Sequence, residues 1–310
     1  MQTWKFSIKP EGISKDAFEK CKELGFVGIG WSQCYEDKQP KDYEEAKSIT
    51  NAYWNEDIKE LRTLYEKIKL GDHLWLHKNG HYYLCIAGDK QLFARDICGD
   101  FRNYDLGHAI SAQWIQVPNE LICGSIQRGT IAQRMIQKIN KISKSEIQLN
   151  QYIAKQLLQN PKWLPKIDLD ELYNTMLKLD VNTLFSIMSP DDFEDIVAGM
   201  LQSEDWILLK STCFRSKPKF EYSLINSEGK YCVVQVKSGR QQLPPQKYIQ
   251  YLNANTDIVL FSNHPIPYPG DPNPNIRCIE ANEIYHWMTE HSGYLSIPLK
   301  MRILLSSQNE

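Results

Sequence analysis

Three polar side chains in the last third of the chain have types and a spacing that could hydrolyse a phosphodiester. Gln235 and Lys237 alternate with valines in the apolar segment 231–237, and Glu221 lies in the segment before it. Carboxylate and amide oxygens are ligands for Mg²⁺, which polarises a phosphate and lowers the pKa of a bound water. A lysine beside that water can orient it and stabilise the developing negative charge. These residue types predict a metal-dependent hydrolytic site, provided that the fold brings them together.

A β-hairpin is the element that would position these side chains. The tripeptide 227–229, Ser-Glu-Gly, is typical of a three-residue hairpin loop with glycine in the left-handed conformation. Such a loop sets Glu221 opposite Gln235, on one face of the hairpin, with Cβ atoms about 5 Å apart. Lys237 follows on that face, about 6.6 Å further along the strand. A shift of one residue would turn Glu221 into the core. The opposite face is apolar and is expected to be buried: Cys232, Val234 and Val236.

A helix before the hairpin offers a second carboxylate. The sequence Ser-Pro-Asp-Asp at 189–192 supplies an N-cap, a proline at the first helical position and acidic first-turn residues, and predicts a helix over 191–202. Glu194 lies on this helix. We assign the catalytic roles to Glu194, Glu221, Gln235 and Lys237, and metal ligation to Glu221, Gln235, the Val236 carbonyl and Glu194.

The helix glutamate, the strand glutamate and the sequence Gln235-Val236-Lys237 resemble the PD-(D/E)XK restriction-endonuclease superfamily. The most similar variant is the Mrr-like one, in which Gln-x-Lys replaces Glu-x-Lys. The likeness covers roughly residues 186–262, and it implies a mixed-sheet α/β domain that cleaves DNA with Mg²⁺, for which Mn²⁺ can substitute. Two residues depart from the usual pattern: Glu221 stands in place of an aspartate, and the neutral Gln235 removes one negative charge. Metal affinity then leans on Glu194, and a degenerate, inactive site is the alternative.

A basic stretch before the hairpin could follow a phosphate backbone. The formal net charge of −2 argues against indiscriminate coating of nucleic acid, so contact must come from local patches. A solvated basic face is the alternative interpretation. The candidate phosphate-binding residues are Lys210, Arg215, Lys217 and Lys219.

The first part of the chain contains three segments that resemble the PUA-like superfamily, including EVE-type domains. These are 28–31 (Gly-Ile-Gly-Trp), 71–75 (Gly-Asp-His-Leu-Trp) and 82–88, within a likeness that spans about residues 1–125. The resemblance implies a small β-barrel, and several members of the superfamily bind a modified base flipped into an aromatic pocket. An extruded base stacks on flat aromatic faces. Core packing is the alternative for each candidate ring: Trp31, Tyr53, Trp54 and Trp75.

The order of predicted elements gives an α/β fold, α+β overall, in three parts. Residues 1–130 are expected to form the PUA-like recognition domain, a β-barrel with helices. Within it, a polar stretch follows Trp31, a helix is predicted over 56–68, and an Asn-Gly hairpin turn is predicted at 79–80. Residues 131–185 form a helical connector that begins with a helix over 134–142, and residues 186–310 form the restriction-endonuclease-like domain. A chain of 310 residues is long enough to bury two cores.

The cysteines and the hydropathy pattern bear on the compartment. Eight scattered cysteines form no CxxC pair, and Cys85 and Cys232 lie in apolar runs, so we expect reduced core thiols. The N-terminal sequence has no apolar signal region, and no stretch approaches the length of a membrane span. These features predict a cytoplasmic protein without a membrane partner.

These interpretations combine into one expected function. We expect a Mg²⁺-dependent DNA endonuclease of restriction or phage-defence type, whose N-terminal module recognises double-stranded DNA, with modified bases among its targets. A homodimer is expected, because double-strand cutting generally needs two active sites. Two alternatives stay open: a nucleic-acid-binding protein that has lost catalysis, and an effector nuclease gated by a small nucleotide.

Overall fold

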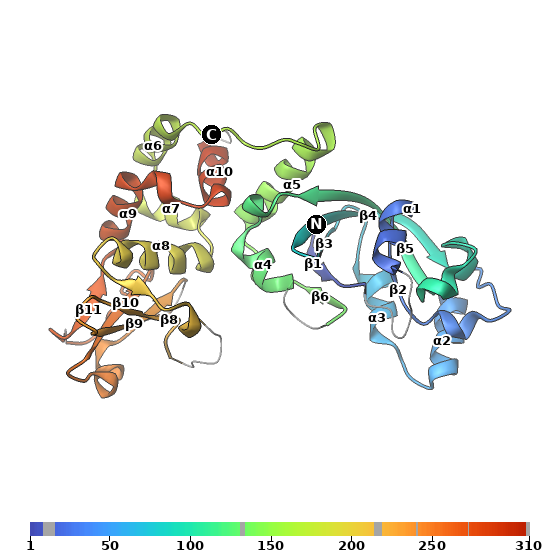
Figure 1. The fold of residues 1–310 in the computed structure, drawn as a ribbon, viewed down its shortest axis with the longest axis horizontal. Helices are drawn as coiled ribbons and strands as arrows, with labels where there is room; N and C mark the ends of the chain where they lie inside the picture. The colour runs from blue at the N-terminus through green and yellow to red at the C-terminus, as the bar shows by residue number, and fades with distance from the viewer. Residues whose placement is uncertain (9–15, 131–133, 214–218, 240, 272, 308–310) are drawn as a thin grey trace. The chain divides into compact units, whose positions relative to one another are not determined.

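The computed structural model describes residues 1–8, 16–130, 134–213, 219–239, 241–271 and 273–307. Contacts divide the chain into a first unit, Met1–Ile142 with Asn150–Leu164, and a second unit, Ser143–Leu149 with Pro165–Glu310. Each unit has its own mixed sheet and its own hydrophobic core (Figure 1). The α+β class predicted from the sequence is therefore confirmed. The segment expected as a helical connector contributes residues to both units.

The first unit is built on a six-stranded sheet with the order β2-β5-β4-β3-β1-β6. β1 and β3 are parallel, and the other neighbours are antiparallel. In the part of the chain that is described, no pairing joins β2 to β6, so the sheet is open and the barrel implied by the PUA-like resemblance is not closed. The strands are β1 (Thr3–Phe6), β2 (Phe26–Ile29), β3 (His73–Lys78), β4 (His81–Phe93), β5 (His108–Val117) and β6 (Ile136–Lys138).

A tight turn joins β3 to β4, as the sequence predicts. Asn79 and Gly80 have φ values of 52° and 80°, and Lys78 pairs with His81 across them. Two successive residues with positive φ match the right-handed twist of the flanking strands. The helices that the first unit contains or shares are α1 (Ala17–Leu24), α2 (Tyr43–Trp54), α3 (Lys59–Arg62), α4 (Gly124–Thr130) and α5 (Lys144–Gln159).

Two segments of the first unit differ from the sequence-based prediction. The polar stretch after Trp31 contains helix α2. The buried residues of this helix are the small side chains Ala46 and Thr50, so its sequence shows only a weak apolar periodicity. The predicted helix over 134–142 is wrong, because residues 136–138 form β6 along the edge of β1. Hydrogen bonding to that edge satisfies backbone groups of both strands, and this tertiary gain outweighs the local helical preference.

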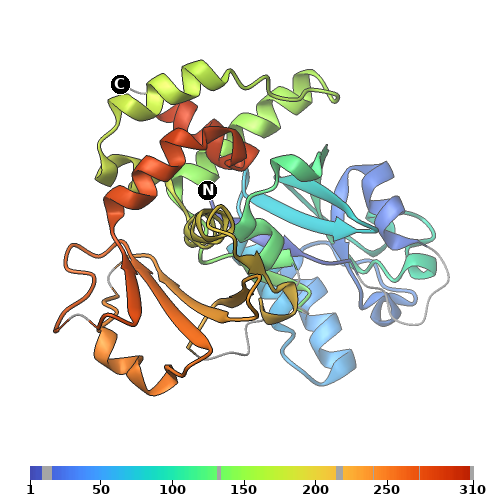
Figure 2. The same cartoon turned by 60° about the vertical axis from the view of Figure 1, so that its left-hand side comes forward.

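The second unit is built on a five-stranded sheet with the order β11-β10-β9-β8-β7. β7, β8 and β9 are antiparallel neighbours, whereas β9, β10 and β11 run parallel (Figure 2). β9 is therefore the strand at which the two patterns meet. The strands are β7 (Ile207–Leu208), β8 (Tyr222–Ile225), β9 (Tyr231–Lys237), β10 (Thr256–Ser262) and β11 (Ile276–Ile279).

Helices cover one face of this sheet and form the core of the second unit with it. Cys232, Val234 and Val236 of β9 are each less than 5% exposed, and they lie in one cluster with apolar residues of the five helices. The buried apolar face predicted for this strand is thus confirmed. The helices are α6 (Leu169–Lys178), α7 (Val181–Ile187), α8 (Pro190–Gln202), α9 (Ala281–Glu290) and α10 (Ile297–Ser306).

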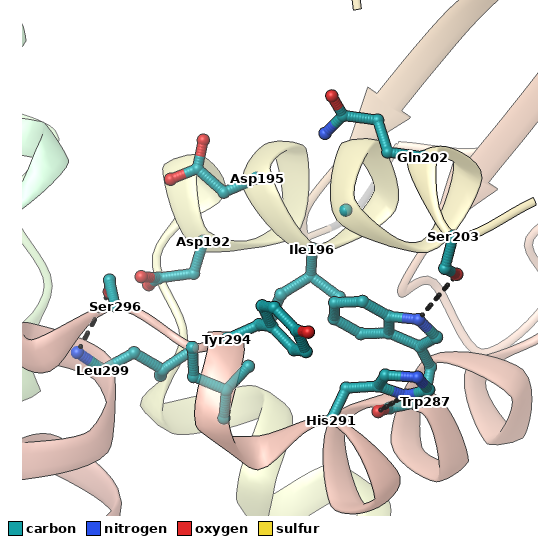
Figure 3. Close-up of a pocket in the computed structure, with 12 residues that line it drawn as sticks. Asp192, Asp195, Ile196, Gln202, Ser203, Trp287, His291, Tyr294, Ser296 and Leu299 are labelled. Carbon is teal, nitrogen blue, oxygen red and sulfur yellow. Dashed lines mark hydrogen bonds between the residues drawn. The ribbon is translucent and has the colours of Figure 1, made fainter. Parts of the chain in front are cut away.

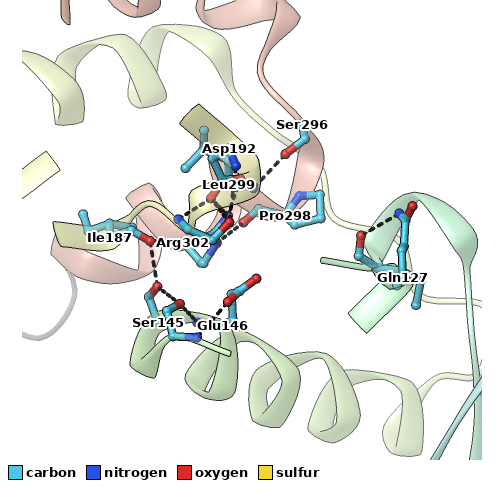
Figure 4. A network of polar contacts seen from close by, with 12 residues as sticks. Gln127, Ser145, Glu146, Ile187, Asp192, Ser296, Pro298, Leu299 and Arg302 are labelled. Carbon is cyan, nitrogen blue, oxygen red and sulfur yellow. Dashed lines mark hydrogen bonds and ion pairs between the residues drawn. The ribbon is translucent and has the colours of Figure 1, made fainter. Parts of the chain in front are cut away.

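A buried ion pair ties α10 to the beginning of α8. One guanidinium nitrogen of Arg302 lies 2.8 Å from both carboxylate oxygens of Asp192, and another donates to the Ile187 carbonyl (Figure 4). Asp192 also accepts from the backbone N–H and the hydroxyl of Ser189, which completes a capping box at the start of α8. The side chains of Arg302 and Asp192 are 1% and 9% exposed. Because water hardly reaches either side chain, the two opposite charges compensate each other.

The expectation of core thiols holds for five of the eight cysteines, whereas Cys98 and Cys278 are partly exposed and Cys213 is exposed. The eight cysteines are free, and Cys85 and Cys232 are buried. Burial raises the pKa of Cys232 to about 12, so it is an unreactive core thiol. None of the helices in the described ranges combines the length and apolar character needed to cross a bilayer.

Two buried histidines of the first unit are held neutral. His108 Nε2 lies 2.9 Å from the Tyr35 hydroxyl and 3.1 Å from Thr50 Oγ1, and burial lowers the pKa of His108 to about 3. Burial likewise lowers the pKa of His73 to about 4, against the opposing attraction of Asp72. Both rings are therefore expected to be neutral in the folded unit near pH 7.

The first unit is therefore expected to lose stability in mild acid. From pH 6.5, the usual histidine value, down to about 4, the unfolded chain binds protons that the folded unit does not. The free energy of unfolding should then fall by up to about 1.4 kcal/mol per pH unit for each histidine. Urea unfolding followed by peptide-resolved hydrogen exchange measures this slope. His108→Gln should remove about half of it, whereas the same change at the exposed His81 should keep the wild-type slope.

Candidate active site

The hairpin of β8 and β9 has the register that the sequence predicts. Gly229 has a φ of 79°, and the Asn226 N–H donates to the Lys230 carbonyl at 3.1 Å. Tyr222 pairs with Val234, and the Glu221 N–H donates to the Val234 carbonyl at 2.8 Å. The predicted pairing of Asn226 with Lys230 is thus confirmed, and the ladder is paired as far as Tyr222 and Val234. Just beyond that pair, the side chains of Glu221 and Gln235 are in contact.

The side chains of Glu221, Gln235 and Lys237 meet at one carboxylate oxygen. Lys237 Nζ lies 2.6 Å from Glu221 Oε1, and Gln235 Nε2 donates to the same oxygen at 2.7 Å. Gln235 Nε2 also donates to the Val236 carbonyl at 3.1 Å. Gln235 is 3% exposed, whereas the side chains of Glu221 and Lys237 are 28% and 34% exposed. The cluster is therefore anchored in the interior and opens to solvent at its charged end.

Residues that follow β9 cover this face of the sheet. Gln235 pairs with Leu260 of β10, and Leu260 belongs to a small apolar cluster with Leu243. Val233, Phe220 and Tyr248 pack against that cluster. The segment after β9 thus folds back over the face that carries Gln235 and excludes water from its amide. Helix α8 packs with the opposite face of β9.

Tyr248 is a residue of this region that the sequence analysis did not single out. Burial raises its pKa, and the nearby Tyr251 and Glu221 raise it further, so the phenol stays protonated close to the carboxylate. The Phe220 ring lies 6.0 Å from the Tyr248 ring and 5.3 Å from the Tyr251 ring. Tyr248 and Tyr251 lie in short irregular turns, where apolar periodicity gives no signal of a site.

Glu194 lies on α8, as the sequence predicts, and it is half-buried. The structure links it to the hairpin through its main chain, because the Tyr222 hydroxyl donates to the Glu194 carbonyl at 3.0 Å. The charge of Glu194 adds to the burial that raises the pKa of Tyr222. Tyr222 belongs to the core on the α8 side of the sheet, whereas Gln235 faces the other side. A ligand role for the Glu194 carboxylate stays a prediction.

The oxygen atoms around the Gln235 amide fit a hard divalent cation. The amide nitrogen points at two acceptors, Glu221 Oε1 and the Val236 carbonyl. Amide nitrogen and oxygen exchange places on a half-turn of the group, which would direct three oxygens to one point. Mg²⁺ prefers such oxygen ligands and retains several waters. In the described ranges no group of three or more His, Cys, Asp or Glu side chains could hold a metal, so this mixed donor set differs from an acidic cluster.

The predicted phosphate-binding residues lie near the start of the hairpin as far as they are described. Lys219 is exposed, and its ammonium lies 4.9 Å from the centre of the Tyr251 ring. Lys210 is exposed in a short turn after β7. Arg215 and Lys217 lie outside the described residues. The Lys219 ammonium group therefore lies beside the aromatic residues that flank Glu221.

The four rings predicted to bind a base do not converge in the first unit. Trp75 is 1% exposed, on the side of β3 opposite to Leu74 and Leu76, and its ring offers no free face. Trp31 is half-buried and packs against the core on the Leu74 side, edge-on to His108. Tyr53 and Trp54 contact each other at the end of α2, where they are 54% and 46% exposed.

A substitution in the turn tests how strongly the register depends on glycine. Gly229→Ala is expected to lower the free energy of unfolding of the second unit by about 1 kcal/mol, because a Cβ disfavours positive φ even where nothing crowds it. Gly293 is the matched control, since it has open space but no positive φ. Gly293→Ala should be neutral or slightly stabilising, as chemical denaturation would show. Equal effects at both positions would contradict the assignment.

Comparison of the chain with protein-family models, with curated proteins and with solved structures returns no match.

Proposed function

We propose that the second unit is a Mg²⁺-dependent nuclease domain that hydrolyses phosphodiester bonds of DNA. The observation that supports this most directly is the convergence of Gln235 Nε2 and Lys237 Nζ on Glu221 Oε1. A surface hairpin has no structural need to bury a glutamine amide against a carboxylate. The resemblance to the PD-(D/E)XK superfamily, with its Mrr-like Gln-x-Lys variant, gives the arrangement a chemical interpretation.

Each residue of the cluster has a distinct role in this proposal. Glu221, the Gln235 amide oxygen and the Val236 carbonyl would hold the cation, whose chemistry when bound would be to polarise a phosphate and to lower the pKa of a bound water. The Lys237 ammonium lies 2.6 Å from the Glu221 carboxylate, where it would orient a water and stabilise negative charge on the phosphate. Glu194 on α8 is proposed as a second carboxylate, and Lys219 as a contact to the backbone of the substrate.

We propose further that the first unit recognises double-stranded DNA, with modified bases among its targets. Tyr53 and Trp54 support this role, because two adjacent large aromatic rings at about half exposure are costly to leave in water without a partner. The cleaving assembly is a homodimer in this proposal, since each chain contributes one candidate site.

The exposed ring pair provides a direct test of recognition. The double variant Tyr53→Ala/Trp54→Ala is expected to weaken DNA binding by about tenfold or more, since stacking on one ring contributes about 1–3 kcal/mol. Fluorescence anisotropy with labelled duplexes in Ca²⁺ or EDTA measures the affinity without cleavage. Leu70→Ala removes an apolar side chain that is 72% exposed from the first unit and serves as the control. Unchanged binding by the double variant would reject this pair as the contact.

Digestion of a DNA panel tests the proposed activity. Unmodified, methylated and glucosylated duplexes are incubated with the protein in Mg²⁺ or Mn²⁺, and EDTA reactions serve as blanks. We expect metal-dependent cleavage of at least one substrate. Absence of cleavage of any substrate by folded protein would overturn the restriction-type proposal. Binding without cleavage would identify a nucleic-acid-binding protein, and cleavage only on addition of cyclic nucleotides would identify a gated effector nuclease.

A further inference from the structure

Among the described residues, the helical layer of the second unit exposes large apolar side chains at two places. Tyr294, 83% exposed, lies in the turn before α10, beside a cavity of 630 Å³ that α8 and α9 also line (Figure 3). Helix α6 exposes three such side chains: Leu169, Tyr173 and Leu177 are 46%, 43% and 52% exposed. Because these three follow one another at a spacing of four residues, they form a continuous row along one side of the helix.

The other side of α6 is already used for packing within the second unit. Leu172 and Met176 are buried in its core, and the helix contacts α9 and α10 (Figure 1). The Tyr285 hydroxyl of α9 donates to the Met176 carbonyl at 3.2 Å. The exposed row therefore lies on the side of α6 that the core of this unit does not use. An exposed apolar row bordered by polar residues is typical of a protein interaction site.

The charges beside this row are placed so that two copies of the helix complement each other. Asp170, Asn174 and Lys178 form a second exposed row, which is acidic at the start of α6, neutral in the middle and basic at the end. Within the described residues, the side chains of Asp170 and Lys178 have no charged partner. When a second copy of α6 lies antiparallel to the first across Tyr173, Asp170 of each copy meets Lys178 of the other. The two helix dipoles are then opposed as well, which favours this direction.

We propose that the exposed side of α6 is an interface with a second copy of this chain, formed by two antiparallel α6 helices about a two-fold axis near Tyr173. In this isologous contact Tyr173 packs on its counterpart, Leu169 packs on Leu177, and two pairs of Asp170 with Lys178 border them. Two helices of ten residues cover less surface than the about 800 Å² per partner of a standard complex, so we expect a dissociation constant in the micromolar range. This inference rests on the proposed homodimer, for which it names the surface, and it does not depend on Mg²⁺ or on cleavage.

Sedimentation equilibrium of the full chain, from about 1 µM to about 300 µM, tests this interface. The wild type is expected to dimerise. Leu177→Glu and Tyr173→Glu should each raise the dissociation constant at least about tenfold, because each variant sets a carboxylate in the apolar row. Both positions are exposed, so the helical circular dichroism spectrum should be kept. Ile266→Glu is the matched control, because it adds the same charge at a residue of the second unit that is 62% exposed, and it should leave the association unchanged.

Two outcomes of this experiment would overturn the inference, and they differ in what they leave standing. A wild type that stays monomeric throughout would overturn both the interface and the proposed homodimer. A dimer that persists in both α6 variants would overturn the interface alone. Neither outcome bears on the hairpin cluster, which the DNA panel tests separately.

Charge reversal tests the antiparallel direction of the two helices. Asp170→Lys and Lys178→Glu should each weaken self-association by about three- to tenfold, because each sets like charges against each other twice. Mixing the two variants restores both opposite pairs, since one copy then carries two lysines and the other two carboxylates. The mixture should therefore associate about as tightly as the wild type. A mixture that associates no more tightly than either variant alone would overturn the antiparallel pairing.

Discussion

Replacing Lys237 by alanine is expected to lower the rate of DNA cleavage by about 10²–10³-fold, the usual cost of removing one preorganised donor that stabilises charge in a transition state. The ammonium lies 2.6 Å from Glu221 Oε1, so alanine also leaves that carboxylate with one fewer partner. Both side chains are about one-third exposed, and water can replace the lost interaction in the resting protein. The rate should therefore fall while the fold is retained. Single-turnover cleavage at saturating protein measures the chemical step.

Lys230→Ala is the matched control for Lys237→Ala. Lys230 precedes the same strand and pairs with Asp257 at 2.7 Å, at a similar exposure of 38%. This substitution removes the same charge and a similar ion pair, and it should leave the cleavage rate within a few-fold of the wild type. A Lys237→Ala protein that cleaves at the wild-type rate would remove the lysine from the proposed chemistry. Equal losses in both variants would indicate a general electrostatic effect on DNA binding.

The second large effect is expected at the buried ion pair of the helical layer. Arg302→Met leaves the Asp192 carboxylate in the interior without its guanidinium partner. Removing one member of such a pair typically costs about 3–5 kcal/mol, a large part of the stability of an ordinary domain. The Ile187 carbonyl also loses a donor. Urea unfolding followed by hydrogen exchange of α8 and α10 peptides measures the loss in the second unit alone.

Two further variants keep this prediction testable even if Arg302→Met folds poorly. Arg277→Met breaks an exposed pair with Glu204, both side chains being 37% exposed, and should cost about 1 kcal/mol or less. The double variant Arg302→Met/Asp192→Asn removes both buried charges but keeps an amide oxygen that can accept from Ser189, and it should recover more than about half of the lost stability. A single-variant loss no larger than that of Arg277→Met would contradict the assigned role of the pair.

The part of the site that could be predicted from the sequence is the part set by local rules. The loop at 227–229 and the alternation of β9 fix the register of residues 222–225 against 231–234, and Glu221 contacts Gln235 at the end of that ladder. The start of α8 could also be predicted, because the capping Ser189 and the proline and aspartates after it are adjacent in the chain. These features need no knowledge of the rest of the fold.

The remaining features depend on contacts between distant residues, for which short patterns carry no signal. The cover over Gln235 comes from Leu243 and Tyr248 in irregular turns. The ion pair of Arg302 and Asp192 joins residues 110 positions apart. β6 took the place of a predicted helix because the edge of β1 offered it hydrogen-bond partners. In each case contacts between distant residues decided the structure, and at β6 they outweighed a local helical preference.

The short span of the β8–β9 hairpin also bears on the order in which the second unit folds. Glu221 and Gln235 are 14 residues apart, so closing the chain between them costs little entropy compared with bringing Arg302 to Asp192. Local contacts of this kind form early, and long-range helix packing follows. Weakening the turn, as in Gly229→Ala, is then expected to slow refolding, whereas Arg302→Met is expected to speed unfolding. The polar cluster would be assembled in solvent first and covered afterwards.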